Sequence, residues 1–362
     1  MARNKKYWLL AGSAFFVAYF FIAAKPVPVE TILAPRWLSS LESSYPLSLP
    51  GGEAGGAEAN TLIPFVLGRR FGYVDGGGNF TVNRARQDQF SISGDYWAEY
   101  AAIPGAIEVR DPRNELAVTL EAGGGYPLFI DGRIFLLNEE GNSLRAVDGE
   151  GQVRWVYDFP APLTDIDAAA GLILAGSLDG TVELLDDAGK RVFFFEPGGS
   201  RLAAIYGCRI SSDGSRLAIV SGYDDQRFLL LERFGDSYKV IFHEFLNDGF
   251  HWGVHLAFID SGSRVIFERQ GGLGIYDIIT RKSLYLPLPG NIEAVDSYGG
   301  DNLVFVINAM EDGRKELTAI RYPGTVVLRA PFQAEDVFLG REGNRLYLGG
   351  GGTIASFELD KR

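Results

Sequence analysis

Apolar and polar residues alternate over short stretches that end at turn residues along most of the chain. Over residues 171–190, for example, an apolar run reaches the turn at Asp179-Gly180, and an alternating run then ends at Asp186. Runs of four to eight residues with a period of two, separated by Gly and Asp, are typical of strands joined by hairpins. No long helical pattern interrupts residues 87–360. The pattern therefore predicts an all-β domain.

One motif recurs within this pattern: a glycine, five residues and an acidic residue, as from Gly180 to Asp186. The glycine permits the positive φ of a tight turn, and the acid is expected to cap the next turn by accepting backbone N–H groups. The acids fall at positions 111, 148, 186, 277 and 358, the copy ending at 148 being one residue longer. Missing members near Glu232 and Arg321 divide the interval from 111 to 358 into six steps of about 41 residues.

A period of about 40–45 residues built from short strands is typical of the blades of a β-propeller. We therefore predict a seven-bladed propeller rather than a β-sandwich. The last unit has three strands, and surplus strands at 62–85 are predicted to complete it and close the ring. These strands also leave an eight-bladed ring as the alternative. The predicted units are 87–124, 126–160, 162–198, 201–246, 252–288, 291–332 and 334–360.

The N-terminal residues have a different character. Residues 1–6 are basic, and residues 7–24 form an uncharged apolar run that at 1.5 Å per residue is about 27 Å long, enough to cross a bilayer core. The basic residues place residues 1–6 in the cytoplasm, followed by a transmembrane anchor at 7–24. A signal peptide cleaved after Ala24 is the alternative. Residues 25–61 read as a Pro- and Gly-containing linker, with a helical turn or membrane-surface segment at Thr31 to Leu41, and residues 62–362 as the propeller domain.

Charge excludes one class of partner. The net charge is −12, and the first 24 residues contribute +3 from Arg3, Lys5 and Lys6, so the remainder carries −15. An acidic body repels phosphate backbones, so nucleic-acid binding is not expected. The single cysteine, Cys208, cannot form an internal disulfide and is expected to be a small buried apolar residue.

The sequence predicts no catalytic, cofactor or metal site. His251 and His255 are four residues apart, a spacing that binds metals on a helix, but Gly249 and Gly253 indicate a loop. No Gly-x-Ser-x-Gly motif and no phosphate-binding glycine loop occurs. Aromatic and polar residues near predicted strand ends are instead candidates for contact with a partner protein. These candidate contact residues are Phe250, His251, Trp252, Tyr206 and Tyr223.

The repeats resemble known propeller families. Residues 176–190 resemble a quinoprotein-type (PQQ-like) repeat, residues 210–218 resemble a WD40 or TolB-type turn, and Tyr276-Asp277 stands where WD40 repeats have Trp-Asp. The whole layout resembles uncharacterised membrane-anchored propeller proteins of spirochaetes. Quinoprotein dehydrogenases use a vicinal cysteine pair beside their cofactor, and this chain has one cysteine. The resemblance therefore does not extend to that cofactor.

These observations lead to two functional hypotheses. The first is a membrane-anchored, extracytoplasmic propeller that acts as a protein-interaction scaffold in cell-envelope assembly. It is similar to the propeller subunit of the outer-membrane β-barrel assembly machine, which uses such repeats to hold partner proteins. The second is a lyase, hydrolase or quinoprotein-like enzyme, or a glycan-binding propeller, with its ligand in the central channel. The sequence favours the scaffold, and we expect its partners to be envelope proteins.

Overall fold

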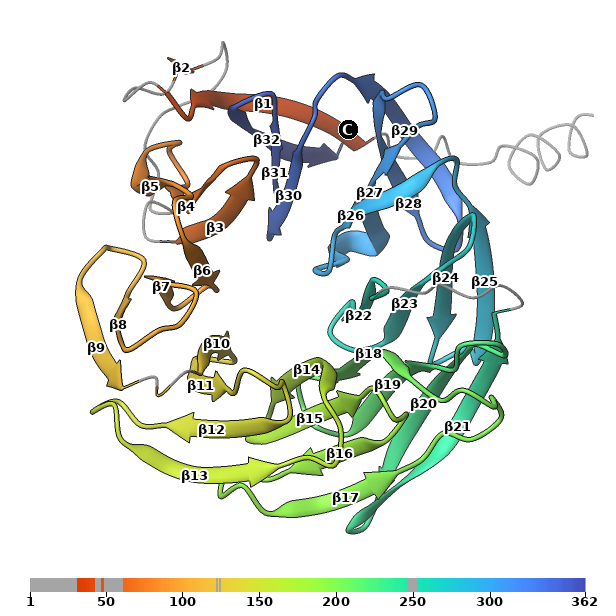
Figure 1. Ribbon diagram of the computed structural model, residues 1–362. Coiled ribbons are helices and arrows are strands. Elements are labelled where there is room, and N and C mark those ends of the chain that lie inside the picture. The colour runs from red at the N-terminus through yellow and green to blue at the C-terminus, as the bar shows by residue number, and fades with distance from the viewer. Residues whose placement is uncertain are drawn as a thin grey trace, which may run out of the picture.

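The computed structural model describes residues 31–42, 47–48, 61–121, 123, 125–246 and 253–361. Their strands form eight antiparallel sheets arranged around a central axis like the blades of a wheel (Figure 1). The protein is therefore an eight-bladed β-propeller. The prediction of seven blades is wrong, and the eight-bladed alternative is confirmed. The all-β prediction is confirmed as well: the described residues contain one short 3₁₀ helix, η1 (Gly300–Asn302), and otherwise strands and turns.

We number the blades 1 to 8 in chain order and count the strands of a blade outward from the axis. Blades 2 to 7 have four strands each, blade 1 has three, and blade 8 combines three C-terminal strands with two N-terminal ones. Blades 1 to 4 contain β3 (Leu62–Leu67), β4 (Arg70–Asp75) and β5 (Phe80–Ala85); β6 (Gln89–Ile92), β7 (Trp97–Tyr100), β8 (Ala106–Arg110) and β9 (Leu116–Glu121); β10 (Tyr126–Ile130), β11 (Arg133–Leu137), β12 (Ser143–Val147) and β13 (Val153–Asp158); and β14 (Leu163–Ala169), β15 (Leu172–Ser177), β16 (Val182–Leu185) and β17 (Arg191–Phe195). Blades 5 to 8 contain β18 (Ile205–Ile210), β19 (Arg216–Ser221), β20 (Arg227–Phe234) and β21 (Ser237–Phe245); β22 (Leu256–Ile259), β23 (Arg264–Arg269), β24 (Gly272–Asp277) and β25 (Lys282–Pro287); β26 (Asn291–Val295), β27 (Leu303–Ala309), β28 (Lys315–Arg321) and β29 (Thr325–Phe332); and β30 (Val337–Glu342), β31 (Arg345–Gly350), β32 (Thr353–Lys361), β1 (Thr31–Ser40) and β2 (Leu47–Ser48).

The hydrophobic core is divided among the gaps between neighbouring blades. Leu174 and Val182 of blade 4, for example, pack against Ile205 and Leu217 of blade 5, and all four are almost fully buried. Seven further clusters fill the other gaps around the ring in the same way. Each sheet has apolar side chains on both faces, so a single blade exposes them and becomes stable only between two neighbours.

The acidic residue of the repeat caps its turn as predicted at Asp111, Asp148 and Asp186, whereas Asp277 accepts one backbone N–H, from Thr280, and Glu358 lies within β32. Asp186 Oδ1 accepts the backbone N–H groups of Ala188 and Lys190 at 3.0 and 2.9 Å, in the turn between the third and fourth strands of blade 4. Asp111 and Asp148 make the same pair of bonds in blades 2 and 3. Satisfying two backbone donors with one carboxylate fixes the turn and hence the hairpin register.

The ring closes through a strand that the sequence reading missed. β1 pairs with β32 along its length, from Thr31 opposite Lys361 to Ser40 opposite Thr353, so the two ends of the described chain share blade 8 (Figure 1). The expectation of a helical turn or membrane-surface segment at Thr31 to Leu41 is therefore wrong. So is the expectation that strands at 62–85 complete the last unit, because they form blade 1 themselves.

The predicted cytoplasmic tail at residues 1–6 and the predicted anchor at residues 7–24 lie outside the described residues. Within the described part of the chain, no helix is both long and apolar enough to span a bilayer.

Candidate functional site

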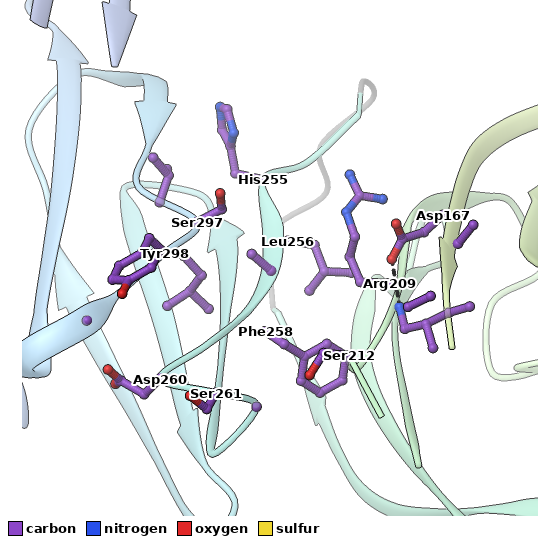
Figure 2. Close-up of a pocket in the computed structure, with 18 of the residues that line it drawn as sticks. Asp167, Arg209, Ser212, His255, Leu256, Phe258, Asp260, Ser261, Ser297 and Tyr298 are labelled. Atoms are coloured by element: carbon purple, nitrogen blue, oxygen red, sulfur yellow. Dashed lines mark hydrogen bonds between the residues drawn. The ribbon is translucent and has the colours of Figure 1, made fainter. Parts of the chain in front are cut away.

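A cavity of about 960 Å³ lies along the axis-facing strands of blades 4 to 7. It runs beside β14, β18 and β22 and reaches the connection between β26 and β27 (Figure 2). Its polar wall combines two acids, a cation and an imidazole with hydroxyl groups. These residues are Asp167, Arg209, Ser212, His255, Asp260, Ser261, Ser297 and Tyr298. The volume falls within the range of natural ligand sites.

Two carboxylates fix the position of β18 against β14. Asp165 Oδ2 accepts the backbone N–H of Cys208, and Asp167 Oδ2 accepts that of Ile210, both at 2.8 Å. These two N–H groups are two residues apart, so they lie on the same edge of β18, the edge that has no neighbouring strand in its own sheet. The acids are also two residues apart and replace that missing strand. Blades 4 and 5 are thereby joined at the wall of the cavity.

Asp165 also binds the cation of the cavity. Arg209 Nη1 donates to Asp165 Oδ2 at 2.5 Å and to the carbonyl oxygen of Cys208 at 2.6 Å. Burial raises the pKa of Asp167, partly offset by the bond from Ile210 and by the charge of Arg209. The carboxylates thus hold this part of the wall together, and Arg209 presents a positive charge whose direction they fix.

His255 is positioned by its backbone. Its N–H donates to Glu268 Oε2 at 3.1 Å, and its carbonyl oxygen accepts the N–H of Glu268 at 2.8 Å. Figure 2 shows the ring of His255 and the guanidinium of Arg209 extending toward the same end of the cavity, away from Asp260. Burial, and next the charge of Arg209, lowers the pKa of His255. A neutral imidazole can donate one hydrogen bond and accept another, which suits a polar ligand.

This shift predicts how stability depends on pH. Because the folded-state pKa of His255 lies below its unfolded value of about 6.5, its contribution to stability is complete above that pH and is lost as pH falls through the folded pKa. We expect His255→Gln to lose less stability than the wild type between about pH 7.5 and pH 5. Urea unfolding at a series of pH values measures this. His243→Gln is the control for losing an exposed histidine, and equal slopes for the wild type and His255→Gln would contradict the prediction.

The candidate contact residues divide into two groups. Phe250, His251 and Trp252 lie outside the described residues. Tyr206 lies in β18 and is partly buried against the cluster between blades 5 and 6, and burial, with a smaller effect of Tyr223, raises the pKa of Tyr206. Tyr223 lies between β19 and β20 and has 43% of its surface exposed. The structure thus describes two of the five predicted residues and does not test the contact role of any of them.

Two exposed leucines lie on segments that contact one another and the turn of Tyr223. Leu178 and Leu202 are 57% and 59% exposed. Tyr223 N donates to Leu202 O at 2.9 Å, which joins the turn after β19 to the connection between blades 4 and 5. The turn containing Leu178 contacts that connection as well, because a Cβ on Gly180 would stand 2.2 Å from Ala203 Cβ. We call Leu178, Leu202 and Tyr223 the blade 4–5 surface, and Tyr206 lies outside it because its partly buried side chain packs against the cluster between blades 5 and 6.

The sequence reading missed both leucines of this surface and most of the cavity. Leu178 was identifiable from the sequence, because it is an apolar residue inside the Ser177–Thr181 hairpin turn, where polar residues are the rule. Asp167 and Arg209 carry no such signal, since charged residues at alternate strand positions are common. His255 was considered only together with His251 as a metal pair. Among the described residues, no group of three His, Cys, Asp or Glu could hold a metal ion.

Comparison with known proteins agrees with this architecture. A family model described as "beta-propeller protein" matches residues 1–361. A protein of Treponema pallidum (strain Nichols), described as uncharacterised, is 27% identical over 347 residues, covering 95% of this chain and 92% of its own length. This relative agrees with the resemblance to spirochaete propeller proteins.

Solved structures show the same fold at low sequence identity. The crystal structure of BamB from Moraxella catarrhalis is similar with a TM-score of 0.60 and 16% identity, covering 90% of this chain and all of that one. The computationally designed protein Ika8 is similar with a TM-score of 0.60 and 16% identity, covering 83% of this chain and 96% of that one. A natural and a designed propeller match equally well, so these similarities concern the fold alone.

Proposed function

Because this chain belongs to the β-propeller family, we propose that it is a scaffold that holds a partner protein against its blade 4–5 surface. In this proposal residues 7–24 anchor it in the cytoplasmic membrane, and the propeller, whose described part begins with β1 at Thr31, stands on the extracytoplasmic side. The partners are envelope proteins, and the process is cell-envelope assembly. The similarity to BamB supports a propeller of this architecture, and the resemblance of the repeats to a subunit that holds partner proteins supports the role.

The observation that carries the proposal is the apolar content of the blade 4–5 surface. Leu178 and Leu202 expose more than half of their area although they stand in turns, and Tyr223 lies beside them. Large apolar and aromatic side chains on a rigid surface are the groups that dominate binding energy when a partner covers them. The pair formed by Arg201 Nε and Asp224 Oδ2, 3.0 Å apart, gives this surface a polar margin. An apolar centre with a charged margin is typical of a protein interface.

The N-terminal sequence supports the proposed location. Arg3, Lys5 and Lys6 precede the apolar run, and a positive flank of this kind is retained in the cytoplasm. The body that follows carries a net charge of −15, which disfavours close contact with anionic lipid headgroups. An anchored propeller of this kind would stand away from the bilayer, with its loops accessible to other proteins.

Site-specific crosslinking in cells tests the proposal. A photoreactive amino acid at Tyr223 should give one dominant crosslinked product with an envelope protein. Leu178→Asp combined with Leu202→Asp should reduce that product about tenfold, because two carboxylates would be buried in the interface. Leu116→Asp and Val153→Asp, at comparably exposed positions on blades 2 and 3, are the matched controls. Equal loss in both sets, or crosslinks only to cytoplasmic proteins, would contradict the proposal.

The cavity along blades 4 to 7 favours a second candidate function, binding of a small polar ligand at the axis. Its volume of about 960 Å³ and the extension of Arg209 and His255 toward the same end fit such a ligand. Hydrolysis through a serine nucleophile would need a base bonded to its hydroxyl, and within the described residues no hydrogen bond joins the ring of His255 to a serine hydroxyl. The geometry therefore supports binding at this site more directly than catalysis. A small molecule that co-purifies with the wild type and is lost from Arg209→Ala would favour this candidate.

A further inference from the structure

The turns of blades 2 to 7 lie on two opposite faces of the disc. Successive strands of a blade are antiparallel, so the turn between the second and third strands lies on one face and the turn between the third and fourth strands lies on the other. Leu178 and Tyr223 of the blade 4–5 surface stand in turns of the first kind, in blades 4 and 5. We call their face the upper face and the opposite one the lower face.

The start of β1 lies on the lower face. Ser40, at the end of β1, lies opposite Thr353, which follows the turn between the second and third strands of blade 8. Thr31 lies opposite Lys361, at the other end of β32. Thr31 therefore occupies the place where a four-stranded blade has its turn between the third and fourth strands.

Only a short piece of chain separates β1 from the apolar run of residues 7–24. Residues 25–30 lie between Ala24 and Thr31, and a chain of this length spans at most about 20 Å when fully extended. β1 itself has 10 residues and spans about 33 Å of the thickness of the disc. With residues 7–24 anchored in a bilayer, this connection is too short to reach around the disc. The lower face is therefore the one held toward the lipids.

The lower-face turn of blade 6 presents an apolar residue next to two cations. Ile279 lies in this turn, between β24 and β25, and has 79% of its surface exposed. Arg281 and Lys282 follow it, are exposed and form no ion pair within the part of the chain that the structure describes. The N–H of Thr280 donates to Asp277 Oδ1 at 2.7 Å, which fixes the conformation of the turn. Ile279 is thus held in an exposed position rather than folded back onto the blade.

The lower-face turn of the neighbouring blade 5 has the same character. Phe234, at the end of β20, is 50% exposed, and Lys239 Nζ lies 5.6 Å from the centroid of its ring. Arg233 is exposed as well, and Asp236 is the single acid within residues 233–239. The two turns thus combine exposed apolar side chains with an excess of positive charge. We call the following residues the blade 5–6 edge: Phe234, Lys239, Ile279, Arg281 and Lys282.

The equivalent turns of blades 2 to 4 are acidic. Residues 111–115, 148–152 and 186–190 each contain two acids and at most one cation. The acids are Asp111, Glu115, Asp148, Glu150, Asp186 and Asp187. An anionic surface below the disc therefore repels blades 2 to 4 and attracts the blade 5–6 edge. The net charge of the chain conceals this difference between the two sides of the ring.

We propose that the blade 5–6 edge contacts the surface of the bilayer, with Phe234 and Ile279 in the headgroup region and its cations beside the phosphates of anionic lipids. This inference rests on the anchoring of residues 7–24 proposed above, because the short connection to Thr31 brings the lower face to the lipids. Exposed apolar residues flanked by cations are the combination that binds an anionic bilayer surface. The rest of the disc stands away from the lipids, and the blade 4–5 surface, on the upper face, points toward a partner.

Fluorescence quenching by labelled lipids measures this contact in the full-length protein. The protein is reconstituted in vesicles of phosphatidylethanolamine and phosphatidylglycerol that carry nitroxide headgroups, and a fluorophore is attached to one introduced cysteine, since the native Cys208 is buried. A label at Ile279→Cys should be quenched at least about threefold more than one at Ile103→Cys or Leu116→Cys. Ile103 is 78% exposed in an upper-face turn of blade 2, and Leu116 is 54% exposed beside an acidic lower-face turn. Equal quenching at all three positions would overturn the proposal.

A label at Ser13→Cys separates the lipid contact from the anchoring on which it rests. Ser13 lies in the apolar run of residues 7–24, so nitroxides in the acyl chains should quench this label if the run is inserted. Quenching at Ser13 with no excess quenching at Ile279 would overturn the lipid contact and leave the anchored scaffold intact. A label at Ser13 that escapes quenching would overturn the anchoring, and this inference with it.

Charge reversal tests the role of the cations. Arg281→Glu combined with Lys282→Glu should remove the excess quenching at Ile279, and high salt should reduce it in the unchanged protein. Arg113→Glu combined with Lys190→Glu is the matched control, because it changes the net charge equally at exposed lower-face positions of blades 2 and 4. The proposal predicts that this control keeps the excess quenching. An equal effect of the two double variants would show that the edge has no special role.

Crosslinking in cells distinguishes lipid from protein as the neighbour of the edge. A photoreactive amino acid at Ile279 should give products with phospholipid and no dominant product with a protein. A single dominant protein product at this position would overturn the proposal, since a protein would then cover the edge. The same amino acid at Ile103, on the upper face, should give no phospholipid product.

Discussion

Asp296→Ala should lower the free energy of unfolding by about 3–5 kcal/mol, because it leaves a buried arginine without its counter-ion. Asp296 Oδ2 lies 2.9 Å from Arg341 Nη1, and the two side chains are 1% and 0% exposed. Arg341 also donates to the carbonyl oxygens of Leu303 and Gly300 at 2.9 and 2.8 Å. These bonds join blade 8 to blade 7. Urea unfolding followed by tryptophan fluorescence measures the loss.

Two comparisons make this prediction specific. Glu99→Ala breaks a pair with the half-exposed Arg84 and should cost no more than about 1 kcal/mol. Removing both partners, with Asp296→Leu and Arg341→Met, should cost less than the sum of the single changes, since neither charge is then left buried alone. A loss for Asp296→Ala no larger than that for Glu99→Ala would show that the pair is solvated.

Trp37→Ala should cost about 3–5 kcal/mol, the usual range for a buried tryptophan. Trp37 is 5% exposed, packs 6.0 Å from the ring of Tyr347 and donates its indole N–H to Gly76 O. It therefore connects the closing strand β1 with blades 8 and 1. The loss should appear both as a lower midpoint in urea and as faster proteolysis at residues 31–40, because β1 would detach from β32 before the rest unfolds.

Trp155→Ala is the matched control for Trp37. Trp155 makes the equivalent indole bond to the following blade, but its strand β13 is continuous in the chain with its own blade. We expect a smaller loss of stability, because Trp155 is only partly buried, and no increase in proteolysis at residues 31–40. Equal proteolysis of the two variants at residues 31–40 would mean that Trp37 does not hold the ring closed.

The repeat pattern located most of the blades because hairpins are local. The alternation and the Gly-to-acid spacing mark strands within a few residues of each other, and the predicted units at 126–160 and 162–198 enclose blades 3 and 4. The pattern failed at blade 1, which has three strands and therefore does not complete the period. It also failed at β1, where Pro35 interrupts the alternation and the register shifts between Pro35 and Trp37. These two failures explain why the sequence predicted seven blades and not eight.

The candidate sites were predictable only where a local signal existed. Tyr206 and Tyr223 are predicted as aromatic residues near strand ends, and in the structure Tyr223 is 43% exposed whereas Tyr206 is partly buried. The cavity was not predictable, because Asp167, Arg209 and His255 come from three blades and are charged or polar residues of ordinary strands. Their meeting depends on the distance between the inner strands of neighbouring blades, a quantity that sequence periodicity does not contain.

The sequence by itself determined the strands, the turn caps, the acidic surface and the need for blades to stack, since these follow from side chains within about ten residues of each other. The tertiary structure alone decided the number of blades and the pairing of β1 with β32. Thr31 and Lys361 meet because a ring of twisted sheets closes only when its last edge finds a partner. That closure joins residues more than 300 positions apart, so no local pattern encodes it.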